Sequence, residues 1–120
     1  MDFRFEQLDI WKSTIEMSGD LFEIAERAEK LHKYRFAEQL NGAVLSISNN
    51  IAEGSGAASP KEFARYLGIA RSSVFETVNL LCIYSKRSLI SDEEYKAFYH
   101  QLLKLSKQIQ SFRQSLLKTS

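Results

Sequence analysis

The polar residues best suited to chemistry lie on both sides of a short segment with little apolar side chain, Gly54-Ser55-Gly56-Ala57-Ala58. Helical spacing puts Ser46, Asn50 and Glu53 on one face, because residues three or four apart are neighbours on a helix. If the chain reverses at this segment, an antiparallel helix pair brings two polar groups together. Those groups are Ser46, Asn49, Asn50 and Glu53 before the segment and Arg71, Ser72, Ser73 and Glu76 after it. They would form either a buried polar network that fixes helix register or the lining of a binding groove.

The sequence contains no residue pattern typical of a catalytic or metal centre. His32 and His100 are isolated, and neither belongs to the Glu-x-x-His pairs of a di-metal bundle site. The serines lack a nucleophile elbow and a matched base. The glycine-rich segment contains no GxxxxGK and follows no expected strand, which argues against a phosphate-binding loop. The sequence therefore predicts a protein that is not an enzyme and uses no metal or cofactor.

Positive charge is concentrated near the C-terminal end of a chain whose net charge is only +1. From Tyr95 onward there is no Asp or Glu, but there are five cations: Lys96, Lys104, Lys107, Arg113 and Lys118. Contacts to RNA phosphates require cations but no base-reading geometry. These five are candidate nucleic-acid contacts, with Arg65 and Arg71 as outlying candidates. The alternative is a solvated helix face whose cations complement the helix dipole.

Apolar residues recur at helical spacing in four segments, approximately residues 7–30, 34–54, 60–87 and 92–117. Serine caps mark the start of the last two: Ser59 is followed by Pro60 and Glu62, and Ser91 by Glu94. Short connections make sequence neighbours antiparallel. The prediction is one all-α domain over residues 1–120, an antiparallel up-down-up-down four-helix bundle.

Two features of these helices bear on packing. Asn41-Gly42 interrupts a continuous apolar stripe, so we expect Gly42 to allow the close approach of another helix. In the last segment the apolar residues of a core seam recur with a period of 3.5: Tyr95, Phe98, Leu102, Leu105, Ile109, Phe112 and Leu116. A second apolar line, Tyr99, Leu103 and Leu117, runs beside this seam. This line indicates either an oligomer interface or a wide core stripe.

The composition and the single cysteine limit the classes to which the protein can belong. An apolar content of 44% and a charged content of 26% are ordinary for a globular domain. Cys82 is the single cysteine, which excludes an intramolecular disulfide and fits a reducing compartment. The first residues do not read as a signal peptide, and the longest apolar run is far shorter than the roughly 20 residues needed to span a bilayer. We expect a cytoplasmic protein.

The residues around the central segment resemble the signature of the bacterial four-helix-bundle proteins encoded in intervening sequences of 23S ribosomal RNA genes. The matching positions are Asn50-Ile51-Ala52-Glu53-Gly54, Ser59, Glu62-Phe63, Tyr66-Leu67, Ile69-Ala70, Ser73 and Glu76. The resemblance implies an antiparallel four-helix bundle that assembles as a ring-shaped homopentamer. A relative similar in fold, the accessory variability protein of diversity-generating retroelements, binds nucleic acid and a reverse transcriptase through a strongly basic surface. This chain differs in Ser72, where glycine is usual, in Ala57, where arginine is common, and in its less basic overall charge.

The sequence and the resemblance together predict a non-enzymatic bundle that forms a homo-oligomeric ring and binds RNA or a nucleoprotein partner. The alternative is a protein–protein interaction scaffold without affinity for nucleic acid.

Overall fold

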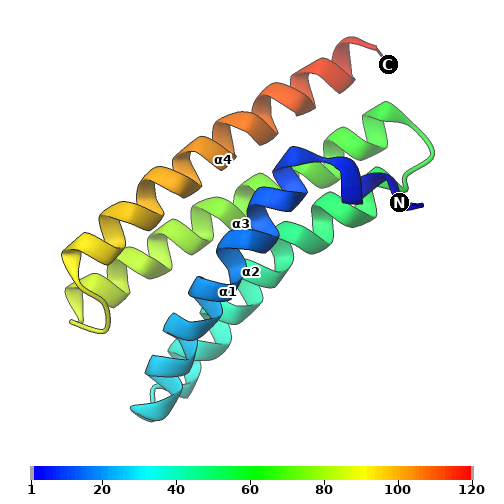
Figure 1. Ribbon diagram of the computed structural model, residues 1–120. Helices are drawn as coiled ribbons and strands as arrows, with labels where there is room; N and C mark the ends of the chain where they lie inside the picture. Colours follow the sequence, from blue (N-terminus) through cyan, green and yellow to red (C-terminus); the bar gives the residue numbers. More distant parts are fainter. Residues whose placement is uncertain (1, 120) are drawn as a thin grey trace.

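A computed structural model describes residues 2–119 of the chain, which form one 3-10 turn and four long α-helices (Figure 1). The elements are η1 (Arg4–Gln7), α1 (Asp9–Lys30), α2 (Tyr34–Ser55), α3 (Pro60–Lys86) and α4 (Asp92–Lys118). Successive helices run in opposite directions along a body with extents of 46 × 23 × 22 Å. The predicted all-α, antiparallel four-helix bundle is confirmed.

Serine caps mark the starts of α3 and α4. The Ser91 hydroxyl accepts a hydrogen bond from the Glu94 backbone N–H, and the Glu94 carboxylate accepts one from the Ser91 N–H, so this capping box is complete. At the start of α3 the Ser59 hydroxyl accepts from the Glu62 N–H, but the Glu62 side chain pairs with Arg65 instead of returning to the cap. The first helix begins at Asp9, two residues later than expected, because residues 4–7 form the separate 3-10 turn.

One hydrophobic core runs the length of the bundle. Its largest fully buried side chains come from every helix: Leu21 and Ile24 from α1, Leu40, Ile47 and Ile51 from α2, Phe63, Leu67, Leu81 and Tyr84 from α3, and Leu102, Leu105 and Ile109 from α4. The core seam of α4 points inward as its spacing requires. The second line on that helix does not, since Tyr99, Leu103 and Leu117 are each 40% exposed.

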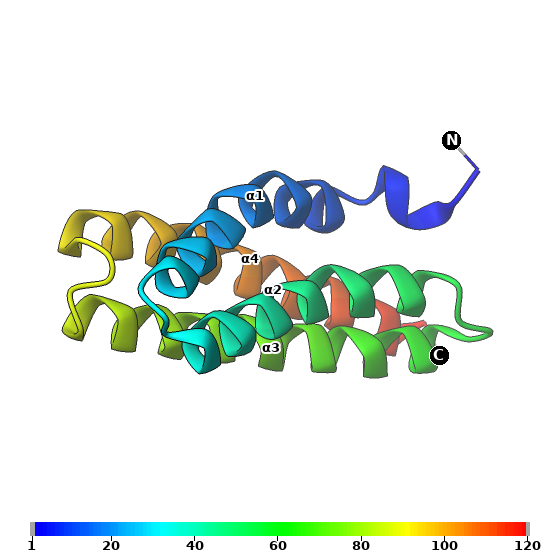
Figure 2. The same cartoon turned by 90° about the horizontal axis from the view of Figure 1, so that it is seen from below.

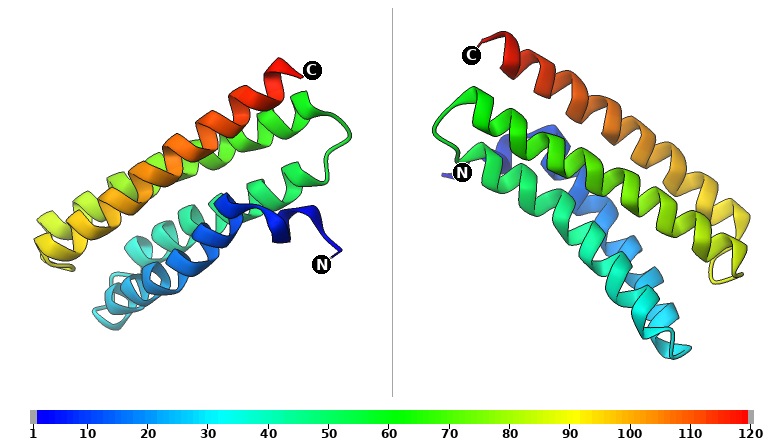
Figure 3. Two further views of the ribbon diagram at one scale, coloured as in Figure 1. Left: turned by 45° about the horizontal axis from the view of Figure 1, so that its top comes forward. Right: turned by 180° about the vertical axis from the view of Figure 1, so that it is seen from behind.

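The bundle is two helical hairpins joined along one seam. Contacts are extensive between α1 and α2, between α2 and α3, and between α3 and α4, whereas α1 and α4 touch little. Figures 2 and 3 show α1 lying along α2 while α4 lies along α3. The α1/α2 hairpin and the α3/α4 hairpin therefore each have an outer face, on opposite sides of the molecule.

The glycine that permits close helix approach is Gly54 rather than Gly42. Gly42 is exposed, and a Cβ added there would meet nothing within 4 Å, so the expectation for this residue was wrong. A Cβ added at Gly54 would lie 2.7 Å from Tyr66 Cβ and 2.8 Å from Phe63 Cδ1. The absence of a side chain at Gly54 therefore lets α2 pack directly against Tyr66 and Phe63 of α3 near the point where the chain reverses.

Candidate nucleic-acid interface

Four lysines of α4 project into solvent: Lys96, Lys104, Lys107 and Lys118. Within residues 2–119 the ion pairs are Arg27–Glu94 and Arg65–Glu62, so no carboxylate in that range neutralises any of these lysines. Lys96, Lys107 and Lys118 are spaced by eleven residues, which is close to three helical turns and puts them on one line of α4. That line is about 33 Å long at 1.5 Å per residue.

Arg113 lies apart from these lysines. It is half-buried, and its Nε–H donates a 3.1 Å hydrogen bond to the Ala64 carbonyl oxygen of α3. The guanidinium comes within 3.4 Å of where a Cβ on Gly68 would stand. Arg113 therefore ties the last turns of α4 to α3, and only the rest of its guanidinium is left for a ligand.

Arg65 and Arg71 are both engaged on α3. Arg65 forms a 2.7 Å ion pair with Glu62 and stacks 4.6 Å from the centroid of the Tyr66 ring. The hydrogen bond from Arg65 lowers the pKa of the Glu62 carboxyl. Arg71 stacks 4.8 Å from the centroid of the Phe75 ring. Its Nε is buried and has no hydrogen-bond partner among the described residues.

The polar residues around the α2–α3 reversal divide into two sets. The Ser73 hydroxyl donates to Ser46 Oγ at 2.7 Å, across the two helices, and Asn50 Nδ2 donates to Ser46 Oγ at 3.0 Å and to the Ser46 carbonyl oxygen at 2.8 Å. This network fixes α2 against α3, because its central bond joins residues 27 positions apart. The second set, Asn49, Glu53 and Glu76, is exposed.

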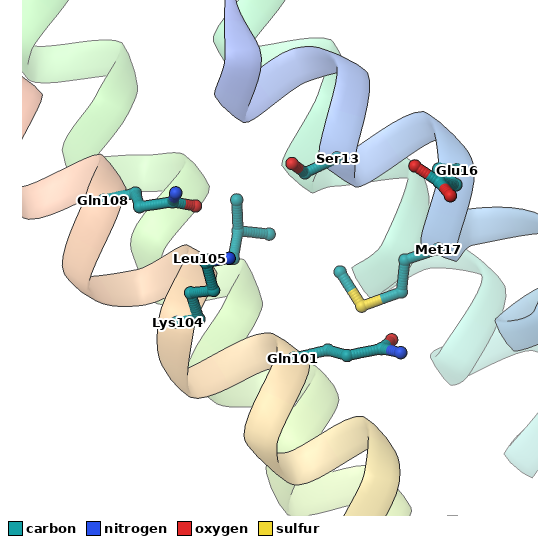
Figure 4. A pocket seen from close by; sticks show the side chains of 7 residues that line it. All are labelled: Ser13, Glu16, Met17, Gln101, Lys104, Leu105 and Gln108. Atoms are coloured by element: carbon teal, nitrogen blue, oxygen red, sulfur yellow. The ribbon is translucent and has the colours of Figure 1, made fainter.

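Two of the hollows beside α4 are lined in part by its lysines. One, of about 190 Å³, separates α1 from α4, with Met17 and Leu105 at its floor and Glu16 and Lys104 at its rim (Figure 4). The other is an apolar groove of about 290 Å³ between α3 and α4. Val74, Val78 and Leu102 line it together with Arg71, Phe75, Tyr99, Leu103, Ser106 and Lys107.

Phe75 was not identified from the sequence as a surface residue, although it is 55% exposed. It stands next to Val74 of the α3 stripe, and its offset from that stripe by one position is the signal that places it outside the core.

Two kinds of feature are missing from the described part of the chain. Residues 2–119 contain no helix long and apolar enough to cross a membrane. The same residues contain no group of three or more His, Cys, Asp or Glu side chains arranged to hold a metal ion.

The fold is also seen in a solved structure. The crystal structure of a protein of unknown function from the S23 ribosomal protein family of Bacteroides thetaiotaomicron superposes with a TM-score of 0.81. The match covers 87% of this chain and 97% of that one, at 21% sequence identity, and so concerns the fold alone. Curated proteins give no significant match. The sequence profile of the 23S rRNA-intervening sequence protein family matches residues 6–111. The chain belongs to the 23S rRNA-intervening sequence protein family.

Proposed function

We propose that this protein is a non-enzymatic, homo-oligomeric bundle of the cytoplasm that binds structured RNA through α4. The observation that carries the RNA-binding part is the row of exposed lysines on α4, which form no ion pair with any carboxylate of residues 2–119. Each lysine that contacts a phosphate releases condensed counterions, and this release favours binding at low salt. An α-helix that presents several such cations along one line suits a phosphate backbone and requires no base-specific groups.

The test of RNA binding is charge reversal at Lys104 and Lys118, two exposed positions of α4 that do not line the α3/α4 groove. The double variant Lys104→Glu/Lys118→Glu should bind a labelled structured RNA at least about tenfold more weakly at low salt. The slope of log K against log salt should also become shallower by about one to two, because up to two phosphate contacts are lost. The matched control is Lys12→Glu/Lys30→Glu, an identical charge change at exposed positions of α1.

The outcome that contradicts the RNA-binding proposal is equal affinity for the wild type and the α4 double variant. Equal weakening by the α1 control would also contradict it, because loss of net charge alone would then explain the effect.

The homo-oligomeric part rests on apolar side chains left in solvent on both hairpins, including Leu45 of α2 and Phe75 of α3, which are 48% and 55% exposed. Exposed apolar patches of this kind mark interaction surfaces. Light scattering measures the mass of the protein in solution and so tests whether it is a homo-oligomer. A 13.8 kDa species at all concentrations would contradict the homo-oligomeric part of the proposal.

The second candidate function is a protein-interaction scaffold that does not bind nucleic acid. The apolar α3/α4 groove favours this scaffold function, since exposed apolar patches mark sites of protein interaction. Absence of RNA binding at low salt, with a partner protein retained on the bundle after nuclease treatment, would support the scaffold over the RNA-binding protein.

A further inference from the structure

A polar line on α4 faces the seam between α1 and α4. Its members are spaced alternately by three and four residues and so share one side of the helix: Gln101, Lys104, Gln108, Ser111, Ser115 and Lys118. All of them are exposed except Gln108, which is half-buried. Because α1 touches α4 little, the line stays accessible from solvent.

Two hollows follow one another along this line and meet at Gln108, which lines both. In the hollow of about 190 Å³, Gln101 and Gln108 reach from α4 towards Ser13 and Glu16 of α1 (Figure 4). The second hollow, of about 550 Å³, continues towards the C-terminal end of α4. Its lining on that helix comprises Gln108, Ser111, Phe112 and Ser115. We call the two hollows together the α1/α4 trough.

The α1/α4 trough has an apolar floor beneath hydrogen-bonding walls. Ile10, Met17 and Leu105 are buried at its floor. The half-buried Phe112 adds an aromatic surface, and its ring is held edge-to-face against Phe63 with 5.3 Å between the centroids. Within residues 2–119 the glutamine and serine side chains of the polar line form no hydrogen bond with the protein. Such a surface suits a flat ligand with an apolar face and polar edges, which is the chemistry of a nucleobase.

The charges along the α1/α4 trough are divided between its two walls. Lys104 and Lys118 belong to α4, and neither forms an ion pair with a carboxylate of residues 2–119. Asp9 and Glu16 line the trough from α1, and carboxylates repel phosphates. A nucleic-acid strand in the trough therefore has its phosphates over α4 and its bases towards α1.

We infer that the α1/α4 trough binds an unpaired stretch of RNA, with phosphates on Lys104 and Lys118 and bases on the apolar floor. The inference rests on the RNA-binding part of the proposed function and names the kind of RNA. The two lysines are four helical turns apart, about 21 Å along α4. That span corresponds to about six nucleotides of a stacked strand at about 3.4 Å per phosphate.

The amide groups of the trough distinguish an unpaired strand from a duplex. The side chains of Gln101 and Gln108 each carry a donor and an acceptor, which match the edges of an unpaired base. In a duplex the opposite strand occupies those edges, and the neighbouring bases cover the faces that would stack on Phe112. A duplex therefore contacts only the lysines, whereas a loop or single strand also uses the floor and the amides.

Two labelled probes of about twelve nucleotides, twice the span between the lysines, test the inference on the full-length chain at low salt. One is a single strand of adenine and cytosine, which cannot pair with itself, and the other is its blunt duplex with the complementary strand. The single strand should bind at least about fivefold more tightly, the gain from one stacked base. A duplex that binds as tightly as the strand, or more tightly, would overturn the inference.

The variant Gln101→Met/Gln108→Met removes both amides while keeping the charge and nearly the volume of the side chains. It should bind the single strand at least about fivefold more weakly, with duplex affinity and the salt dependence unchanged because both lysines remain. The matched control is Gln110→Met/Gln114→Met, the same change at a half-buried and an exposed position of α4 outside the trough. Wild-type affinity of the first variant, or an equal loss in the control, contradicts the assignment.

The α1 wall is tested by Ser13→Trp, which fills the first hollow from an exposed position. The indole should block the floor and weaken single-strand binding at least about fivefold, the contribution of one stacked base. Duplex affinity should not change, and this shows that the variant is folded. If Ser13→Trp binds the single strand like the wild type, the RNA lies on α4 alone and the inference fails.

The lysine variant separates failure of this inference from failure of the proposed function. A wild type that binds neither probe at low salt would remove the RNA-binding part of the proposed function along with the inference, and leave the scaffold function. If Lys104→Glu/Lys118→Glu weakens RNA binding while the glutamine and Ser13 variants do not, the proposed function stands and only the trough is wrong.

Discussion

Arg27 Nη1 lies 2.8 Å from Glu94 Oε2, and this ion pair joins α1 to α4 at the end of the bundle where both hairpins turn. In residues 2–119 it is the one ion pair between two different helices. The Glu94 carboxylate also accepts a 3.0 Å hydrogen bond from the Ser91 backbone N–H. That backbone hydrogen bond, followed by Arg27, lowers the pKa of Glu94.

Replacing Glu94 by Gln should reduce the free energy of unfolding at pH 7 by less than about 1 kcal/mol, since glutamine keeps the cap and the lost ion pair is solvent-exposed. The contribution of a carboxyl with a lowered pKa is present above its unfolded pKa, about 4.3, and is lost as pH falls further. Urea unfolding of both proteins at pH 7 and pH 3 should show a smaller difference at pH 3, because the contribution is lost as pH falls towards and through the lowered pKa of the folded state. Glu93→Gln, at an exposed neighbour, is the control. A difference of the same size at pH 3 would show that charge is not its cause.

Gly54→Ala should destabilise the bundle by about 1–3 kcal/mol, the usual cost of overpacking. The added Cβ would stand 2.7 Å from Tyr66 Cβ, an atom fixed to the α3 backbone, so relief requires the two helices to separate. Gly42→Ala is the matched control in the same helix, at a position with open space, and should stabilise by about 0.5–1 kcal/mol. Chemical denaturation measures both. A neutral Gly54→Ala would show that α2 and α3 adjust without cost.

Sequence reasoning predicted contacts within a helix correctly and failed for contacts between helices. Local signals identified the Ser91–Glu94 capping box and the inward seam of α4, because both depend on residues three or four positions apart. The role of Gly54 depends on side chains of α3, the next helix. The apolar stripe that Gly42 interrupts does not show whether another helix covers the face of α2 on which Gly42 lies.

The candidate site shows the same division. The exposure of the α4 lysines follows from their distance from the core seam. The engagement of Arg113 with Ala64 spans 49 residues, and the Ser46–Ser73 bond requires the register of an antiparallel pair. Neither contact could be read from periodicity, which locates a residue on a helix but not its neighbour across the bundle.

Tyr84→Phe should leave stability at pH 7 unchanged or raise it by up to about 1 kcal/mol. The Tyr84 side chain is fully buried and its hydroxyl has no hydrogen-bond partner in the part of the chain that the structure describes, so removing the hydroxyl removes an uncompensated polar group. Burial raises the pKa of Tyr84 to about 12. The wild type should therefore lose stability as pH rises from 10 towards 12, because in that range Tyr84 ionises readily in the unfolded chain but not in the folded one.

Urea unfolding at pH 7 and pH 11 compares the two proteins, and the phenylalanine variant should show the smaller alkaline loss. A loss of more than about 1 kcal/mol at pH 7 on removal of the hydroxyl would reveal a partner for it, such as an ordered water.

The Ser46–Ser73 bond should appear as coupling in a double-mutant cycle. Each single replacement by Ala should cost about 1 kcal/mol, because the hydroxyl of the other serine loses a partner at a partly buried site. The double variant should cost less than the sum of the two. Ser48→Ala, whose hydroxyl bonds only within its own helix at 3.4 Å, is the control. Strict additivity would show that the hydroxyl pair does not hold α2 to α3.

The sparse contact between α1 and α4 has a kinetic consequence. Helix contacts join chiefly sequence neighbours, so the chain closes no large loop before its core begins to form. Such a low contact order is the property of domains that fold in microseconds to milliseconds. Since α2 and α3 each pack along two neighbours while α1 relies mainly on α2, amides of α1 should exchange with solvent through partial opening, before the central helices separate.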